Sequence, residues 1–156
     1  MEKRVLKIFA ILLVLTLIIL QFLPVNRENP PVDKKLDLLS TEDFSADSKD
    51  LLKAACYDCH SNETKYPWYS YVAPVSFFVE HHILEGREEL NFSEFQSYST
   101  RKKDHKLEEV IDALKKGWMP LSSYVAMHSE ANLTQEQREK LVVEFAQLRK
   151  KVNLNP

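Results

Sequence analysis

Glycine and cysteine are scarce in this 156-residue chain, and each occurs only twice. A sheet protein with many tight turns needs more glycine than this, whereas Leu, Lys, Glu and Ala, which are abundant here, favour helices. The chain is also too short for two ordinary domains, and it contains no internal repeat. We therefore expect one all-α domain built around a single core.

An excess of positive charge is also missing. The formal net charge is −2 at pH 7, and part of the positive charge lies at the N-terminus, where Lys3, Arg4 and Lys7 cluster. The rest of the chain is mildly acidic. Proteins that bind nucleic acids usually present a basic surface to the phosphates, so nucleic acid is not an expected partner.

Residues 1–25 differ in composition from the rest of the chain. The run VLKIFAILLVLTLIILQFL is interrupted mainly by Lys7 and Gln21, and as a helix it would rise about 28 Å, close to the roughly 30 Å of a bilayer core. A cleaved signal peptide is the alternative, but QFLPVNREN offers no small-residue cleavage site. We expect an uncleaved signal anchor that crosses the cytoplasmic membrane once. The C-terminal domain would then lie in the periplasm or another extracytoplasmic space.

The remaining sequence divides into a tether and a helical domain. Residues 26–40 are rich in proline and charge without apolar periodicity, which predicts a tether, and residues 41–156 form the domain. Caps and periodic apolar residues predict about four helices, near residues 45–60, 74–86, 103–116 and 134–152. The expected architecture is therefore a small cytochrome-c-like helical domain behind a transmembrane helix.

Both cysteines lie in the segment CYDCH, three positions apart and directly before a histidine. A c-type haem needs two thiols for thioether bonds and an adjacent imidazole for its iron, which is what this motif offers. A thioredoxin-like pair should follow a buried strand, and zinc would need further ligands that no second cysteine pair supplies. We expect Cys56 and Cys59 to hold one covalent haem c and His60 to be the proximal iron ligand. A tight disulfide without cofactor is the remaining alternative.

The ligand on the opposite face of the iron would separate electron transfer from ligand binding or catalysis. Met119 lies in KKGWMPLSSY, between the end of a predicted helix and Pro120, where a rigid loop could present its thioether. We expect Met119 to be the distal ligand, with His128 as the alternative. His82 could also reach a haem, and Trp68 is one of several aromatic residues that could wall a porphyrin.

Three segments of the sequence resemble the haem-binding domain family, which consists of exported, cytochrome-c-like proteins with one CxxCH motif. They are CYDCHSNETKYPWYSYVAPVSFFV, EGREELNFSEF and GWMPLSSYVAMHSEANLTQEQ, within residues 51–145. The resemblance implies a mostly helical domain, haem attachment at the CxxCH motif, and a functional loop in which Met119 lies near Tyr124 and His128. Two features depart from the family pattern, namely the pair His81–His82 and Phe95 in place of a tryptophan.

These observations predict a membrane-tethered, exported monohaem c-type cytochrome that transfers single electrons and is not an enzyme. Its expected partners are redox proteins of a respiratory or periplasmic electron-transfer system, together with the cytochrome c maturation machinery. A haem-based sensor of small ligands, or a peroxidase-like enzyme with an open sixth position, is the alternative. The enzyme would need an acid–base residue such as His128 or His82.

Overall fold

The computed structural model describes residues 2–154, which contain eight α-helices, three 3-10 helices and no β-strand. This agrees with the predicted all-α class, although the expected count of about four domain helices leaves out the short helices α2 and α7 and joins α3 and α4 into one. The α-helices are α1 (Glu2–Leu20), α2 (Leu38–Thr41), α3 (Ala46–Ala55), α4 (Tyr57–His60), α5 (Val75–Glu89), α6 (Thr100–Lys116), α7 (Ser122–Val125) and α8 (Gln135–Leu154). The 3-10 helices are η1 (Trp68–Tyr71), η2 (Phe92–Ser97) and η3 (Ser129–Ala131).

The prediction of a transmembrane anchor is contradicted, and with it the predicted single-pass location in the cytoplasmic membrane. Within residues 2–154, none of the helices combines the length and the apolar character needed to cross a bilayer. Helix α1 ends at Leu20 and includes Glu2, Lys3, Arg4 and Lys7. Its uncharged part, residues 8–20, rises only about 20 Å at about 1.5 Å per residue, against roughly 30 Å of hydrocarbon.

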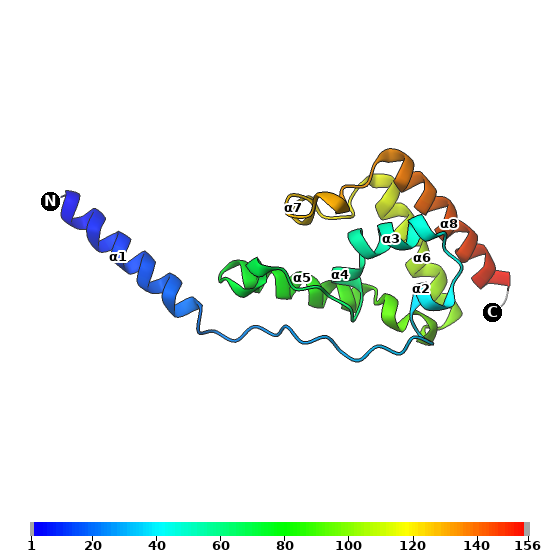
Figure 1. The fold of residues 1–156 in the computed structure, drawn as a ribbon, viewed down its shortest axis with the longest axis horizontal. Coiled ribbons are helices and arrows are strands. Elements are labelled where there is room, and N and C mark those ends of the chain that lie inside the picture. The colour runs from blue at the N-terminus through cyan, green and yellow to red at the C-terminus, as the bar shows by residue number, and fades with distance from the viewer. Residues whose placement is uncertain (1, 155–156) are drawn as a thin grey trace.

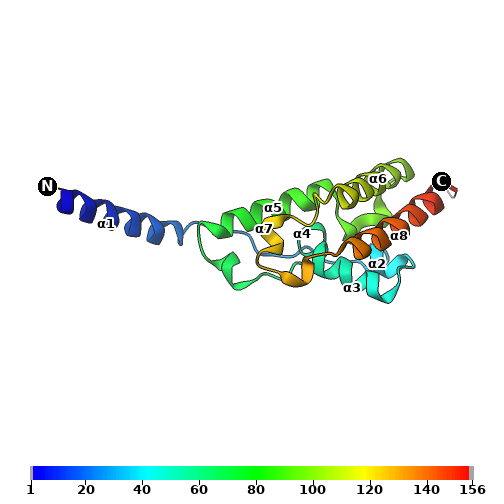
Figure 2. The same ribbon diagram turned by 90° about the horizontal axis from the view of Figure 1, so that it is seen from above.

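Helices α6 and α8 lie side by side and form the largest helix pair of the domain (Figures 1 and 2). Each turns an apolar stripe toward the other, and α2, α3 and η2 close the core around them. Burial of these stripes stabilises the helices more than their intrinsic propensities do. The buried residues of the pair are Leu107, Ile111, Leu114, Leu141, Phe145 and Leu148.

Local sequence signals account for several helix ends. The side chains of Ser45 and Ser99 accept hydrogen bonds from backbone N–H groups in the first turns of α3 and α6. Thr134 and Gln137 bond each other's backbone N–H groups in the predicted capping box before α8. Gly117 ends α6 with φ +68°, a left-handed conformation that glycine adopts without steric cost.

The helix expected to end with the cysteine motif is instead two helices. Cys56 has φ −130° and ψ −42°, and it separates α3 from the single turn of α4. The backbone N–H of Cys56 still donates to the carbonyl of Leu52, so the break changes the direction of the chain without leaving that group unpaired. The Cys-x-x-Cys-His residues therefore lie on a separate turn between α3 and the rest of the domain.

The segment that links α1 to α2 runs in an extended path beside α5 (Figure 1). Gln21 exchanges two hydrogen bonds with the backbone of Ala73, and Arg27 donates to the carbonyl of Ser70. Asn29 donates to the carbonyl of Thr64. The division into residues 1–25, 26–40 and 41–156 stays a prediction. The core itself already includes Leu38 and Leu39 of α2.

Candidate functional site

The turn of α4 packs directly on α5 at Gly86. A Cβ atom at this position would lie 2.7 Å from the backbone oxygen of Cys59, closer than real Cβ contacts allow. Glycine is required here because the backbones of α4 and α5 approach each other closely. The φ angle of Gly86 is not in the left-handed region, so backbone conformation is not the reason. This contact fixes the position of the Cys-x-x-Cys-His turn relative to α5.

His60 is oriented by two backbone carbonyls of the same region. Its Nδ1 lies 2.9 Å from the oxygen of Gly86 and 3.0 Å from that of Leu90. Carbonyl oxygens only accept, so Nδ1 carries the proton and Nε2 keeps its lone pair. No residue among 2–154 forms a hydrogen bond with Nε2 of His60. Metal-binding histidines commonly donate their other ring N–H to a carbonyl in this way. Burial lowers the pKa of His60 and so favours the neutral ring, which is the form that can bind iron.

The two cysteines are unpaired and half-buried. Burial raises the pKa of Cys56 to about 12. Burial, followed by the charge of Asp58, raises the pKa of Cys59 to about 11. Both side chains are therefore neutral thiols near pH 7, and no disulfide joins them.

Three neighbouring cavities surround the motif. The largest, about 500 Å³, is lined by Cys56, His60 and Met119 together with apolar and charged residues of α6. A second of about 310 Å³ is also lined by His60 and Met119, and it adds Cys59 and Tyr124. The third, about 430 Å³, is lined by Cys59 and Tyr124 and is mostly apolar. Each of these cavities is within the size range of ligand pockets in proteins, about 300–1,000 Å³.

The sequence-predicted residues are distributed unequally over these cavities. Met119 shares two cavities with His60, and Trp68 lines the third, although its side chain is 72% exposed. His82 lines the second and third cavities, and its Nδ1 bonds the carbonyl of Phe78 at 2.7 Å. His128 lines none of the three. Its two ring nitrogens lie 2.7 Å from the hydroxyl of Tyr69 and 3.1 Å from a carboxylate oxygen of Glu130.

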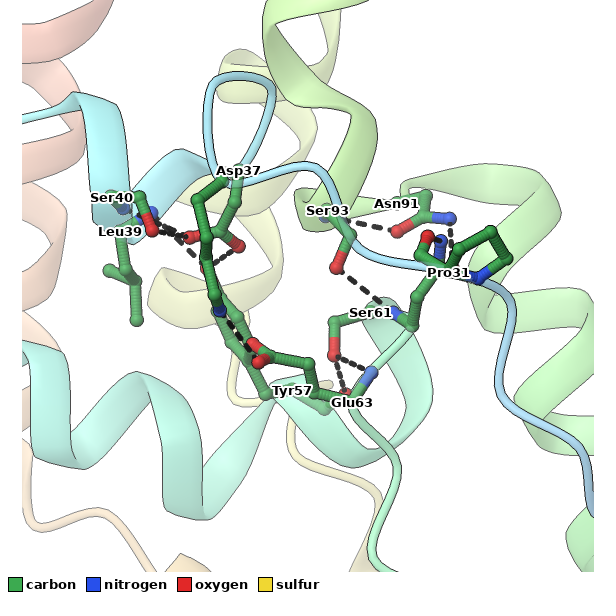
Figure 3. Close-up of polar contacts among 11 residues, drawn as sticks. Pro31, Asp37, Leu39, Ser40, Tyr57, Ser61, Glu63, Asn91 and Ser93 are labelled. Atoms are coloured by element: carbon green, nitrogen blue, oxygen red, sulfur yellow. Dashed lines mark hydrogen bonds and ion pairs between the residues drawn. The ribbon is translucent and has the colours of Figure 1, made fainter.

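The two residues between the cysteines anchor the motif in different directions. Tyr57 is buried, and its hydroxyl donates to Asp37 at 3.0 Å and accepts from the backbone N–H of Leu39 at 3.2 Å (Figure 3). The carboxyl of Asp37 also caps α2 through Ser40. Asp58 lies on the other side, where it accepts a hydrogen bond from the hydroxyl of Tyr124 at 2.8 Å.

A buried polar network fixes the chain just after His60 (Figure 3). The hydroxyl of Ser61 donates to the carbonyl of Tyr57 at 2.7 Å. Asn62 donates its backbone N–H to the hydroxyl of Ser93 at 3.0 Å and accepts from the amide of Asn91 at 2.8 Å. Every buried side-chain polar atom of the described residues has a partner. Fully satisfied networks of this kind hold a turn in one conformation.

The residues present fit a covalently bound haem. Two thiols and an imidazole with a lone pair on Nε2 line cavities whose walls are largely apolar. Within residues 2–154, no three or more His, Cys, Asp or Glu side chains are grouped so that they could hold a metal ion by themselves. Haem iron takes only its axial ligands from the protein, so His60 and one further residue are sufficient.

Sequence reasoning missed the residues that position the site. Gly86, Tyr57 and Asp58 were not singled out, and neither was Arg87, which donates to the carbonyl of Ser61 at 2.8 Å. Gly86 was predicted to end a helix near residues 74–86, whereas α5 continues to Glu89. A glycine inside a helix often marks a close backbone approach, and that signal was therefore missed. The contacts of Tyr57, Asp58 and Arg87 cross 20 or more residues of sequence, and no local pattern indicates them.

Comparison with known proteins gives one match. A family model described as a haem-binding domain matches residues 15–147, which is most of the chain. Neither the curated proteins nor the solved structures include a match. The match agrees with the predicted family and with haem as the cofactor, and the chain belongs to the haem-binding domain family.

Proposed function

We propose that the protein is a monohaem c-type cytochrome that transfers single electrons, with Cys56 and Cys59 bound to the haem as thioethers. The observation that carries this proposal is the orientation of His60. Its Nδ1 proton is donated to two carbonyls, and its ring lines the same two cavities as Met119. This arrangement provides one imidazole and one thioether, the pair of axial ligands common in electron-transfer cytochromes.

A bound haem would supply a reversible one-electron couple at its iron. The chain would contribute three things to that couple. Cys56 and Cys59 would keep the haem attached, and the carbonyls of Gly86 and Leu90 would hold the imidazole of His60 in one orientation. A thioether from Met119 would raise the reduction potential and close the iron to other ligands. The apolar surface of the cavities would reduce the contact of the haem with water, which favours the less charged, reduced state.

The proposal implies two kinds of partner protein. A cytochrome c maturation system would be needed to form the thioether bonds, because thiols that stay neutral near pH 7 react slowly without help. Redox proteins would donate and accept the electron at the surface near the cavities. Trp118 is 65% exposed on the rim of the largest cavity, where a partner could approach it.

The role of Met119 can be tested by the spectrum of the matured full chain, in both redox states and with carbon monoxide added. We expect the wild type to be low-spin and inert to the gas. Met119→Ala should become high-spin and bind it, because the sixth position opens. Met127→Ala is the matched control. Met127 lines only the third of these cavities and does not share one with His60, so this variant should behave like the wild type.

A different outcome would favour the alternative function. One observation supports a ligand-binding or peroxidase-like site. His82 lines two of the cavities, and its Nδ1 is occupied by the carbonyl of Phe78, which leaves Nε2 for proton transfer. If the wild-type ferrous protein already binds carbon monoxide, the electron-transfer proposal is wrong and this second reading replaces it.

A further inference from the structure

The loop that carries Met119 packs only partly against the core, through Tyr124 and Val125 of α7. No residue of α7 is buried, and Met119 itself is 37% exposed. Such a segment depends on a small number of polar contacts to keep its position. Among the described residues, Arg138 bonds the backbone oxygen of Met119, and the other long-range hydrogen bonds of residues 118–130 come from Tyr124 and His128.

Tyr124 connects this loop to the cysteine motif. Its hydroxyl donates to the carboxylate of Asp58 at 2.8 Å, and the carbonyl of Ala54 lies 3.2 Å away. Burial and the carboxylate of Asp58 raise the pKa of Tyr124, so the hydroxyl keeps the proton that it donates. Asp58 lies between the two cysteines. The contact therefore joins the loop of the predicted distal ligand to the turn of the proximal one.

His128 holds Tyr124 from the other side. The two rings are stacked, with centroids 4.3 Å apart and planes 15° from parallel. The hydroxyl of Tyr69 donates to Nε2 of His128 at 2.7 Å, while Nδ1 bonds Glu130 at 3.1 Å. Both ring nitrogens are thus engaged in protein contacts. His128 ties the loop to η1, and η1 packs against α5.

We propose that Tyr124 and His128 form a clamp that holds the Met119 loop on the cysteine turn and so keeps the sixth position of a haem closed. The clamp is anchored by Asp58, which accepts a hydrogen bond from Tyr124, and by Tyr69, which bonds His128. This inference rests on the proposed function, because it assumes that Met119 is the distal ligand. Tyr124 and His128 are positioning residues in this account, and neither touches the iron. Opening the clamp releases the loop, and the iron then accepts an outside ligand.

The test compares Tyr124→Phe with Tyr66→Phe in the matured full chain. Tyr66 is also half-buried, but its hydroxyl makes no hydrogen bond within residues 2–154, so Tyr66→Phe controls for loss of a phenol. We expect backbone amides of residues 119–131 to exchange with deuterium roughly tenfold faster in Tyr124→Phe. That ratio corresponds to about 1.4 kcal/mol, near the lower end of what a hydrogen bond to a charged group contributes, about 1.5 kcal/mol. Carbon monoxide binding to the ferrous protein should become measurable in the same variant. Tyr69→Phe, which removes only the bond to His128, should act in the same direction with a smaller effect.

The possible results separate this inference from the proposed function. If the wild type is inert, Met119→Ala opens the site and Tyr124→Phe behaves like Tyr66→Phe, the clamp is wrong and the proposed function stands. If exchange rises in Tyr124→Phe but carbon monoxide still does not bind, the clamp does not control the sixth position and is also wrong. If the wild type binds the gas freely, both fail together.

Discussion

At the scale of single residues, the Cys-x-x-Cys-His motif is positioned by neighbouring residues that would not themselves bind a haem. Tyr57 and Asp58 fill the two variable positions, and they bond α2 and the Met119 loop respectively. Gly86 admits the backbone of Cys59, and its own carbonyl orients His60. The reactive residues are therefore held by neighbours whose identity matters as much as their spacing.

Gly86→Ala is expected to weaken both folding and haem attachment. The added methyl group would lie 2.7 Å from the backbone oxygen of Cys59, and backbone cannot move aside cheaply. Overpacking of this kind costs about 1–3 kcal/mol of the free energy of unfolding. The shift also displaces the carbonyl that holds Nδ1 of His60. Denaturant unfolding measures the first effect. The second is measured as the fraction of matured chains that carry covalent haem, determined on the denatured chain.

Gly117→Ala is the control for this prediction. A Cβ atom at Gly117 meets no heavy atom within 4 Å, so the cost there is only that of a left-handed backbone, about 1 kcal/mol. Haem retention should stay at the wild-type level. Equal loss of haem in the two glycine variants would show that general destabilisation, and not the contact with Cys59, explains the result.

At the scale of helices, α6 and α8 are joined by charge as well as by their apolar stripes. Arg149 of α8 bonds both carboxylate oxygens of Asp104 of α6, at 2.7 Å and 3.2 Å, and Asn153 adds a bond at 2.7 Å. The hydrogen bonds from Arg149 and Asn153 lower the pKa of Asp104 below its usual 3.8. The folded protein therefore favours the charged carboxylate.

Asp104→Asn should lower the thermal stability at neutral pH and have little effect in strong acid. A carboxyl whose pKa is lowered on folding stabilises the protein above its unfolded pKa of about 3.8, and this contribution is lost as the pH falls through the lower folded value. We expect a loss of about 0.5–1 kcal/mol at pH 7, because the pair is partly exposed. Melting temperatures at pH 7 and pH 2 measure the difference.

Asp112→Asn provides the comparison for that experiment. Asp112 pairs with Lys116 on the same helix, and both side chains are about half exposed, so its loss should change stability by much less. An equal effect of the two substitutions at pH 7, or an effect of Asp104→Asn that persists at pH 2, would contradict the assigned role of Asp104.

At the scale of the whole molecule, the features predicted from sequence are those with local signals. The serine cap before α3, the capping box before α8 and Gly117 after α6 act within a few residues, and these three are confirmed. Helix α6 was predicted to begin near Lys103, whereas it begins at Thr100 behind the cap Ser99. The family was also predicted, because its motifs are read along the chain. Contacts across the fold could not be predicted in this way. The bond between Asp58 and Tyr124 spans 66 residues, and the engagement of both nitrogens of His128 depends on η1.

The wrong prediction of a membrane anchor has a physical reason at the same scale. The apolar run was counted through Lys7 and beyond Leu20, whereas the helix ends at Leu20 and begins with four charged residues among its first six. The residues after it form hydrogen bonds with Ala73, with Ser70 of η1 and with Glu80 of α5. Composition gives the apolar character of a segment, but the fold decides where the helix ends.

The central claim is that one haem is held covalently through Cys56 and Cys59. The most direct measurement is the intact mass of the denatured full chain after expression with a cytochrome c maturation system. We expect the wild type to carry the mass of one haem, which acid–solvent extraction does not remove. The double variant Cys56→Ala, Cys59→Ala should carry none. A wild-type chain that keeps its unmodified mass, or that loses its haem on extraction, would contradict the account.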